Sequence, residues 1–206
     1  MSNWLVYGIG FLAQILFSSR LIVQWVASER QQRVVTPQLF WTLSLMASIL
    51  LFIYGVLRDD FSIMLGQSLT YYIYIRNLQL QEQWQKFPKI VRWVMISFPI
   101  VIVSYFLLNK TIQTDLLFHN PIIPIWLLLL GSIAQMVFVL RFIYQWLISE
   151  VKKTSSLPLG FWILSVFGSL LILIYAVIRV DWILIIGHGF GTLIYIRNIY
   201  LIQKQD

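Results

Sequence analysis

Apolar residues fill most of the chain in runs that short polar segments separate. A run of about 20 apolar residues is the length that an α-helix needs to cross the hydrocarbon core of a bilayer. A backbone inside a bilayer must satisfy its own hydrogen bonds, and this favours helices in such runs. The pattern predicts seven membrane-spanning helices, over residues 4–26, 38–57, 61–79, 90–108, 122–148, 160–178 and 182–202.

Polar positions within these runs recur at a constant offset of 121 residues. Between the two copies, about 28 of 69 aligned positions are identical. The identities include charged and amide side chains, which compositional bias in apolar helices does not explain. The matched pairs include Gly10 and Gly131, Gln14 and Gln135, Arg20 and Arg141, Gln24 and Gln145, Trp41 and Trp162, and Tyr74 and Tyr195.

The repeat sets the expected topology. Each copy holds three helices, and the helix at 90–108 has no counterpart. Three helices reverse the direction of the chain, so one extra span makes the two copies parallel, related by an axis along the membrane normal. We therefore expect an all-α integral membrane protein of 3+1+3 helices. Its parts are a first repeat over 1–85, a linker helix over 86–120 and a second repeat over 121–206.

Composition and charge agree with a membrane protein and give it an orientation. Hydrophobic residues make up 59% of the 206 residues and charged residues 11%, about half the charged fraction of a soluble domain. The first run lacks a basic segment and a cleavage site, so we expect it to remain as a helix. Basic residues cluster after the first, third, fifth and last predicted helices, which predicts an outside N-terminus and a cytoplasmic C-terminus. These residues are Arg30, Arg33, Lys86, Lys89, Arg92, Lys152, Lys153 and Lys204, against Arg58, Lys110 and Arg179 on the other side.

Short motifs occur in both copies and carry a family resemblance. They read Arg-x-x-x-Gln-Trp-x-x-Ser-Glu, Pro-x-x-Phe-Trp-x-x-Ser, Tyr-x-x-x-Arg-x-Asp and Tyr-Ile-Arg-Asn. The series resembles the lipid A biosynthesis N-terminal domain family in two tandem copies, which is similar to the wider PQ-loop group with its SWEET sugar transporters. The resemblance implies the same 3+1+3 layout. The chain departs from that group where Ser19-Arg20 and Leu140-Arg141 replace Pro-Gln. It departs again where Leu51 and Ile172 stand at about the position of a sugar-stacking tryptophan in the related transporters.

Polar and aromatic positions share one face of each predicted helix. In the first helix the repeat-identical positions step by three or four residues, from Gly10 through Arg20 to Gln24, which places them on one stripe. Polar side chains within a bilayer face a bundle interior or a water-filled cavity, because lipid offers them no partner. We therefore expect a central polar cavity. The expected substrate-binding residues are Gln14, Arg20, Gln24, Trp41, Ser44, Gln67 and Tyr74, with Gln135, Arg141, Gln145, Trp162, Ser165, His188 and Tyr195.

Several of these side chains also have structural interpretations. Arg20 and Arg141 lie about six to eight residues from the predicted helix ends, roughly 10 Å, from which a guanidinium reaches the headgroups by snorkelling. Glutamines and serines also join helices to one another. His188 replaces Gln67 and titrates near neutral pH, which leaves proton coupling open. The expected ion pairs at helix ends are Glu29 and Glu150 with Arg76 and Arg197, Arg58 with Asp60, and Arg179 with Asp181.

The residues favour transport over catalysis. The sequence holds no phosphate-binding glycine loop, no metal-ligand cluster and no nucleophile with a base, so we expect neither an enzyme nor a cofactor. We expect a flippase in the bacterial inner membrane for a lipid-linked, phosphate-bearing sugar such as a polyprenyl-phosphate sugar. Its partners are then membrane lipids and a glycosyltransferase, with no nucleic acid. Two alternatives stay open: a SWEET-like facilitator of small polar solutes, and a non-transporting subunit of a glycosyltransferase system.

Overall fold

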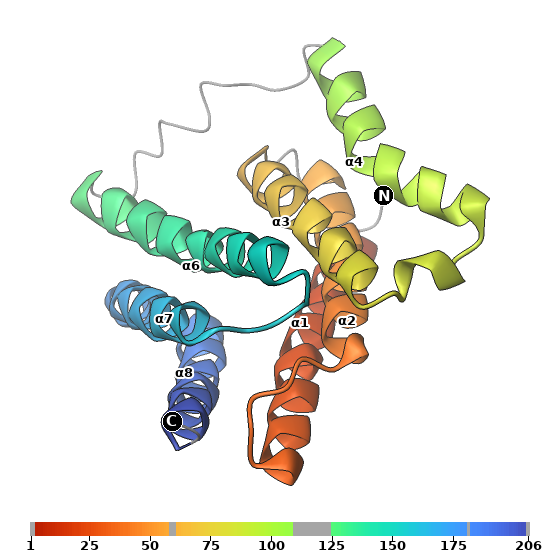
Figure 1. The fold of residues 1–206 in the computed structure, drawn as a ribbon. Coiled ribbons are helices and arrows are strands. Elements are labelled where there is room, and N and C mark those ends of the chain that lie inside the picture. The colour runs from red at the N-terminus through yellow and green to blue at the C-terminus, as the bar shows by residue number, and fades with distance from the viewer. Residues whose placement is uncertain (1–2, 58–60, 109–124, 181, 205–206) are drawn as a thin grey trace. The chain divides into compact units, whose positions relative to one another are not determined.

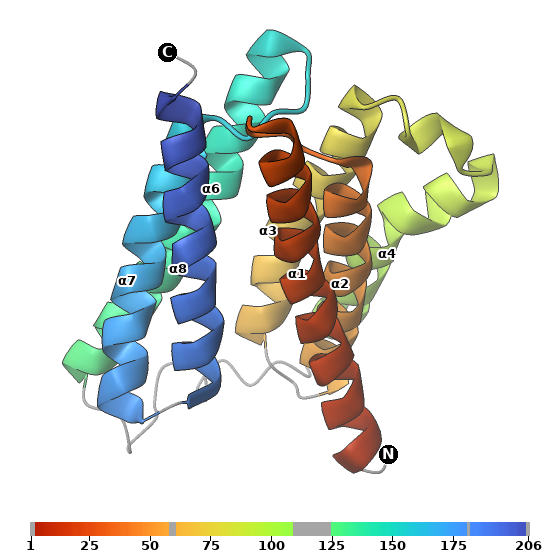
Figure 2. The ribbon, with the colours of Figure 1, turned by 90° about the horizontal axis from the view of Figure 1, so that it is seen from below.

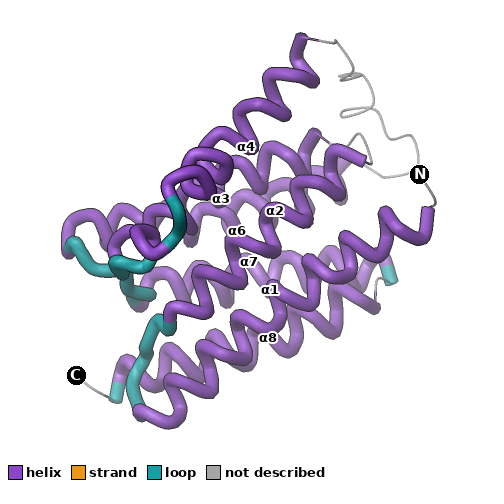
Figure 3. Tube along the Cα trace, turned by 90° about the vertical axis from the view of Figure 1, so that its right-hand side faces the viewer, coloured by secondary structure: helices purple, strands orange, loops and turns teal. Residues whose placement is uncertain are grey.

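The computed structural model describes all residues except 1–2, 58–60, 109–124, 181 and 205–206. Every regular element among the described residues is helical, as Figure 3 shows. The elements, labelled in Figure 1, are α1 (Asn3–Gln31), α2 (Gln38–Leu57), α3 (Phe61–Leu80), the 3-10 turn η1 (Trp84–Lys86), α4 (Lys89–Leu108), α6 (Ile125–Lys152), α7 (Leu159–Arg179) and α8 (Trp182–Gln203).

The all-helical membrane class predicted from the apolar runs is confirmed. By length and apolar composition, five described helices are able to cross a membrane: α1, α2, α6, α7 and α8. The α3 and α4 helices are present as 20-residue helices, and their role as spans remains a prediction, as does the 3+1+3 arrangement. The expected pairs at the external turns involve Arg58, Asp60 and Asp181, which lie outside the described residues.

Two helices are longer than the apolar runs predict, and both end in the same way. The α1 helix continues to Gln31 and α6 to Lys152, through the polar segments that hydropathy assigns to loops. Gln32 and Lys153, which are repeat equivalents, then adopt positive φ values of 51° and 53°. A residue in the left-handed region commonly ends an α-helix, because it lets the next backbone N–H groups reach the last carbonyls. Arg33 N–H accordingly donates to the carbonyl of Ser28 at 3.2 Å.

The chain forms two compact units whose limits differ from those of the repeats. The first unit comprises residues 1–17 and 41–121, and the second comprises residues 18–40 and 122–206. The end of α1, the loop after it and the start of α2 therefore pack with the second repeat. The continuous α1 helix contributes to both units.

In the first unit, α4 packs against α2 and α3 through aromatic residues. The hydroxyl of Tyr71 in α3 donates to the carbonyl of Met95 in α4 at 2.8 Å. The ring of Phe98 in α4 lies 5.5 Å from that of Phe52 in α2, between centroids. The Met95 carbonyl is available because Pro99, which follows it by four residues inside α4, has no N–H to donate.

In the second unit, α7 packs between α6 and α8, and the three helices are seen side by side in Figure 2. The rings of Phe142 in α6 and Phe161 in α7 meet edge to face at 5.4 Å. Trp162 of α7 lies 6.0 Å from Tyr195 of α8. The equivalent pair in the first unit, Trp41 and Tyr74, has the same 6.0 Å separation, so each unit preserves this contact of the repeat.

A close helix contact at Gly10 gives a first prediction. A Cβ added to Gly10 would lie 2.9 Å from the Tyr54 ring, whereas one added to Gly8 of the same helix meets nothing within 4 Å. Overpacking costs about 1–3 kcal/mol, while alanine in an open helical position is slightly favourable. We expect Gly10→Ala to lower the unfolding temperature in detergent and Gly8→Ala to raise it slightly. Equal unfolding temperatures would show that Tyr54 moves aside without cost.

Candidate functional site

The side chain of Arg141 is buried in an aromatic cluster of the second unit. It is 2% exposed, and its Nη1 donates to Ser165 Oγ at 3.1 Å. Its guanidinium carbon lies 3.4 Å from the centroid of the Phe138 ring, at one turn's distance in α6. Aromatic faces attract a guanidinium, and the attraction strengthens where water is excluded. Further rings lie around the same carbon: Phe142 at 4.8 Å, Phe161 at 5.4 Å and Tyr195 at 5.6 Å.

The first repeat contributes a second arginine to this cluster. Arg20, at the equivalent position of α1, is 6% exposed, and its guanidinium carbon lies 5.4 Å from the Phe40 ring centroid. The same carbon lies 5.2 Å from the Phe142 ring centroid, and the carbon of Arg141 lies 4.8 Å from it, so about 10 Å at most separates the two guanidinium groups. One ring thus contacts two positive charges. Both guanidinium groups point into the aromatic cluster, in contrast to the snorkelling alternative.

Two like charges this close repel each other in a poorly polar environment. At 10 Å and an effective dielectric constant of 20, the repulsion is about 1–2 kcal/mol. An anion bound near both guanidinium groups would relieve it. A guanidinium binds a phosphate or a carboxylate through two parallel charge-assisted hydrogen bonds, so the site suits an anion of this kind. The cluster of Arg20, Phe40, Phe138, Arg141, Phe142, Phe161, Ser165 and Tyr195 is called the arginine site below.

Gln24 and Gln145 hold the loops that follow their helices. Gln24 Nε2 donates to Ser28 Oγ at 2.9 Å, and that hydroxyl accepts from the Val35 N–H at 3.1 Å. The second repeat has the same contacts, with Gln145 Nε2 donating to Ser149 Oγ at 2.8 Å. These bonds explain why glutamine and serine recur four residues apart. They give the two glutamines a structural role beside the predicted contact with substrate.

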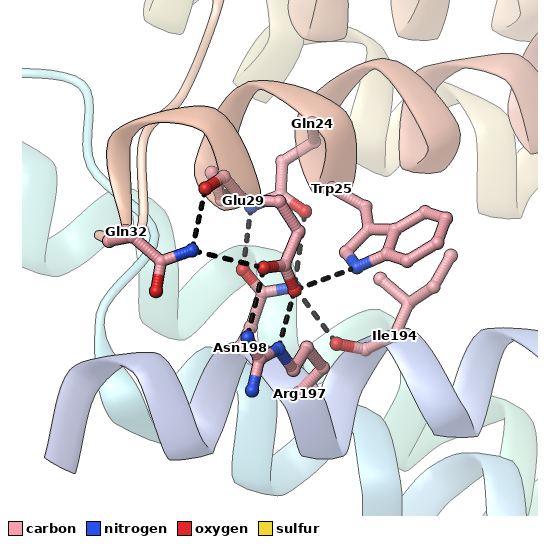
Figure 4. A network of polar contacts seen from close by, with 8 residues as sticks. Gln24, Trp25, Glu29, Gln32, Ile194, Arg197 and Asn198 are labelled. Carbon is pink, nitrogen blue, oxygen red and sulfur yellow. Dashed lines mark hydrogen bonds and ion pairs between the residues drawn. The ribbon is translucent and has the colours of Figure 1, made fainter. Parts of the chain in front are cut away.

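A polar network joins the two repeats at the end of α1 (Figure 4). Gln24 and Asn198 of α8 exchange two hydrogen bonds, from Gln24 Nε2 at 2.7 Å and from Asn198 Nδ2 at 3.2 Å. The carboxylate of Glu29 pairs with Arg197, which donates from Nη2 at 2.9 Å and also from Nε. The sequence predicted Arg76 and Arg197 as the partners of Glu29 and Glu150 and left open which arginine pairs with which glutamate. The observed partner belongs to the other repeat.

The remaining predicted residues occupy varied places. His188 is half-buried, with its ring edge-to-face to Phe138 at 5.2 Å. Gln14 is exposed and Gln67 is half-buried in the first unit, while the side chain of Gln135 lies outside the described structure. Ser44 and Ser165 are fully buried. Among the described residues, no group of three or more His, Cys, Asp or Glu side chains has the arrangement of a metal site.

The sequence repeat reveals only some of the aromatic residues of the arginine site. Phe138 and Phe161 have identical equivalents in the first repeat, which was a usable signal. Phe142 has none, because Leu21 stands at the equivalent position. Its contact with both arginines depends on the way α1 and α6 meet, and no pattern in one helix reveals that.

Comparison with known proteins shows a family match and several curated relatives. A family model described as the Lipid A Biosynthesis N-terminal domain matches it twice, over residues 9–79 and 130–200. Curated relatives include proteins named lipid-A-disaccharide synthase from Chlamydia felis (strain Fe/C-56), 30% identical over 210 residues, and from Chlamydia pneumoniae, 30% identical over 207 residues. Each alignment covers 98% of this chain and 34% of the relative, so the chain spans about a third of their length. No solved structure matches the chain.

The comparison corrects the prediction that the chain is no enzyme and confirms the predicted family. The prediction that the chain is no enzyme is contradicted, because nearly all of it aligns with proteins whose name is that of an enzyme. Catalytic motifs were the wrong criterion, since a segment that aligns with about a third of an enzyme need not contain that enzyme's catalytic residues. The wider grouping with PQ-loop proteins remains a prediction. The double match to one family model, over more than half of the chain, shows that this protein belongs to the Lipid A Biosynthesis N-terminal domain family.

Proposed function

We propose that the chain is a membrane module of lipid A biosynthesis that binds the phosphate-bearing headgroup of a lipid-linked sugar and moves it across the inner membrane. The observation that carries the proposal is the arginine site, where one buried arginine from each repeat contacts Phe142. The family and the names of the relatives support the link to lipid A.

The charge and the surroundings of the site favour a lipid phosphate over a neutral sugar. Buried charged groups within a membrane are costly and mark pathways for charged substrates. The lipid tail would remain in the bilayer, against the apolar side chains that the helices expose, such as Phe167 at 56% and Leu193 at 67%. The headgroup would reach the guanidinium groups between helices. Rocking of one three-helix repeat against the other would then give alternating access.

A second candidate function follows from the relatives. Their name describes synthesis, and they align with 98% of this chain. The arginine site would then hold a lipid-linked sugar for a synthase without moving it between leaflets. Both candidates require phosphate binding at the same residues, and they differ in whether the headgroup changes sides.

Purified protein in liposomes tests the proposal. We expect it to move a polyprenyl-phosphate-linked sugar from one leaflet to the other, measured by the headgroup's accessibility to an enzyme added outside. Free monosaccharides should not exchange, because the site offers charge where a sugar pocket needs an open stacking face. Binding without movement would favour the synthase module. Rapid monosaccharide flux without lipid movement would support the SWEET-like facilitator instead.

The orientation is a separate prediction. Basic loops are held in the cytoplasm, so reporter fusions after Asp115 should report the outside, and fusions after Lys153 and Asp206 the cytoplasm. Alkaline phosphatase and a fluorescent protein are active on opposite sides and give complementary signals. A cytoplasmic signal at Asp115 would exclude the 3+1+3 arrangement and with it the two parallel repeats.

A further inference from the structure

The network between α1 and α8 contains a partly exposed ion pair between Arg197 and Glu29. Arg197 donates hydrogen bonds from Nε and Nη2 to the Glu29 carboxylate. A guanidinium binds phosphate in the same two-point geometry. The Arg197 side chain is 39% exposed and that of Glu29 is 28% exposed, so an approaching anion reaches the pair. Trp25 holds the carboxylate in place through its Nε1, at 3.2 Å from Glu29 Oε1.

The pair stands beside a buried amide contact. Gln24 and Asn198 are both 0% exposed and satisfy each other's amide groups in a reciprocal pair of hydrogen bonds. Together Gln24, Glu29, Arg197 and Asn198 form what we call the α1–α8 latch, shown in Figure 4. The bonds that join α1 to α8 in the latch all run between side chains, and Asn198 Nδ2 also donates to the Ile194 carbonyl of its own helix at 2.9 Å. The latch therefore opens without loss of helical hydrogen bonds.

The latch lies next to the arginine site, toward the C-terminal ends of both helices. Gln24 follows Arg20 by one turn of α1. In α8, Asn198 follows Tyr195 by three residues, and the Tyr195 ring lies 5.6 Å from the guanidinium carbon of Arg141. A headgroup that comes from these helix ends, which is the cytoplasmic side in the proposed orientation, meets the latch before the arginines.

We propose that Arg197 is the first contact of the phosphate and that the phosphate opens the latch by displacing the Glu29 carboxylate. This inference rests on the proposed function of the arginine site. Glu29 acts as an internal competitor, which keeps the latch closed until an anion takes its place. The headgroup then passes to Arg20 and Arg141 as α1 and α8 separate. Competition of this kind lowers the apparent affinity by the fraction of protein in which the latch is open.

Two opposite shifts in affinity test the proposal. With a short-chain polyprenyl phosphate as the probe, binding to the full chain in detergent is measured by calorimetry. Glu29→Gln removes the competitor and should tighten binding about fivefold, whereas Arg197→Gln removes the first contact and should weaken it about fivefold or more. The exposed Arg33 is the matched control, and Arg33→Gln should change nothing. If both latch variants weaken binding, the pair is structural and the proposal is wrong.

Cysteine labelling follows the latch without any lipid. The chain contains no cysteine, so Ser165→Cys gives a single reporter beside Arg141. We expect Glu29→Gln and Arg197→Gln each to speed its modification by a charged maleimide about fivefold. The double exchange Glu29→Arg with Arg197→Glu should restore slow labelling, which excludes a general loss of folding. Unchanged labelling in the single variants would overturn the latch. Faster labelling, together with no binding of polyprenyl phosphate by the chain that retains Ser165, would overturn the proposed function and, with it, the opening by phosphate.

Discussion

Arg141→Lys is expected to weaken binding of a short-chain polyprenyl phosphate by about 10- to 100-fold, although it keeps the positive charge. Lysine has no planar fork, so the two parallel hydrogen bonds to phosphate are lost, and charge-assisted bonds contribute about 1.5–3 kcal/mol. Lysine also has no flat face to stack on Phe138, whose ring centroid lies 3.4 Å from the guanidinium carbon. Arg20→Lys should act in the same direction. Calorimetry on purified protein measures both.

Arg33→Lys is the control for these variants, because Arg33 is exposed and lies outside the arginine site. It should bind like the unaltered protein. The amount of folded protein, judged by size-exclusion chromatography, should be the same in all three variants. Equal binding by Arg141→Lys and the unaltered protein would mean that no phosphate is held there. A loss of folded protein in both Arg20→Lys and Arg141→Lys would show that these two side chains serve packing.

Phe142→Leu should lower the stability of the folded protein by about 2–4 kcal/mol, the largest effect that we expect from one substitution. The ring is 4% exposed, so its loss leaves a cavity. It also contacts both guanidinium groups, at 5.2 Å and 4.8 Å from its centroid, and each cation–π contact contributes about 0.5–2 kcal/mol. Thermal unfolding in detergent measures the change. Phe167→Leu, at a residue that is 56% exposed in α7, should cost much less.

A double-mutant cycle separates the two contributions at Phe142. In protein that already carries Arg20→Met, Phe142→Leu should cost less than in the unaltered chain, because one of the two guanidinium contacts has gone. Identical costs in the two backgrounds would show that Phe142 acts by packing alone. The aromatic ring would then have no part in holding the charges together.

The sequence predicted those features of the fold that depend on a single helix. Apolar length and the 121-residue repeat predicted helices at all seven sites, and the same positions gave Arg20 and Arg141. Helix ends were less accessible. The segments after Gln24 and Gln145 are polar, yet they remain helical because serine and glutamine side chains hold the following loops.

Contacts between helices were harder to predict, because a repeat shows which residues matter without showing which of two equivalent partners each one meets. Glu29 had two candidate partners, Arg76 and Arg197, with identical neighbours in the sequence. The choice of Arg197 depends on the packing of residues 18–40 with the second repeat. Phe142 was missed for a related reason, since its role depends on a helix from the other copy.

The exchange of amides between Gln24 and Asn198 has a consequence for the ancestry of this chain. Each repeat carries its own glutamine and its own asparagine, but Gln24 uses the asparagine of the other copy. A protein with a single copy would therefore make this contact only with a second molecule of itself. An ancestral homodimer fits that requirement. Gene fusion would then have fixed two copies in one molecule and freed them to differ, as Leu21 and Phe142 now do.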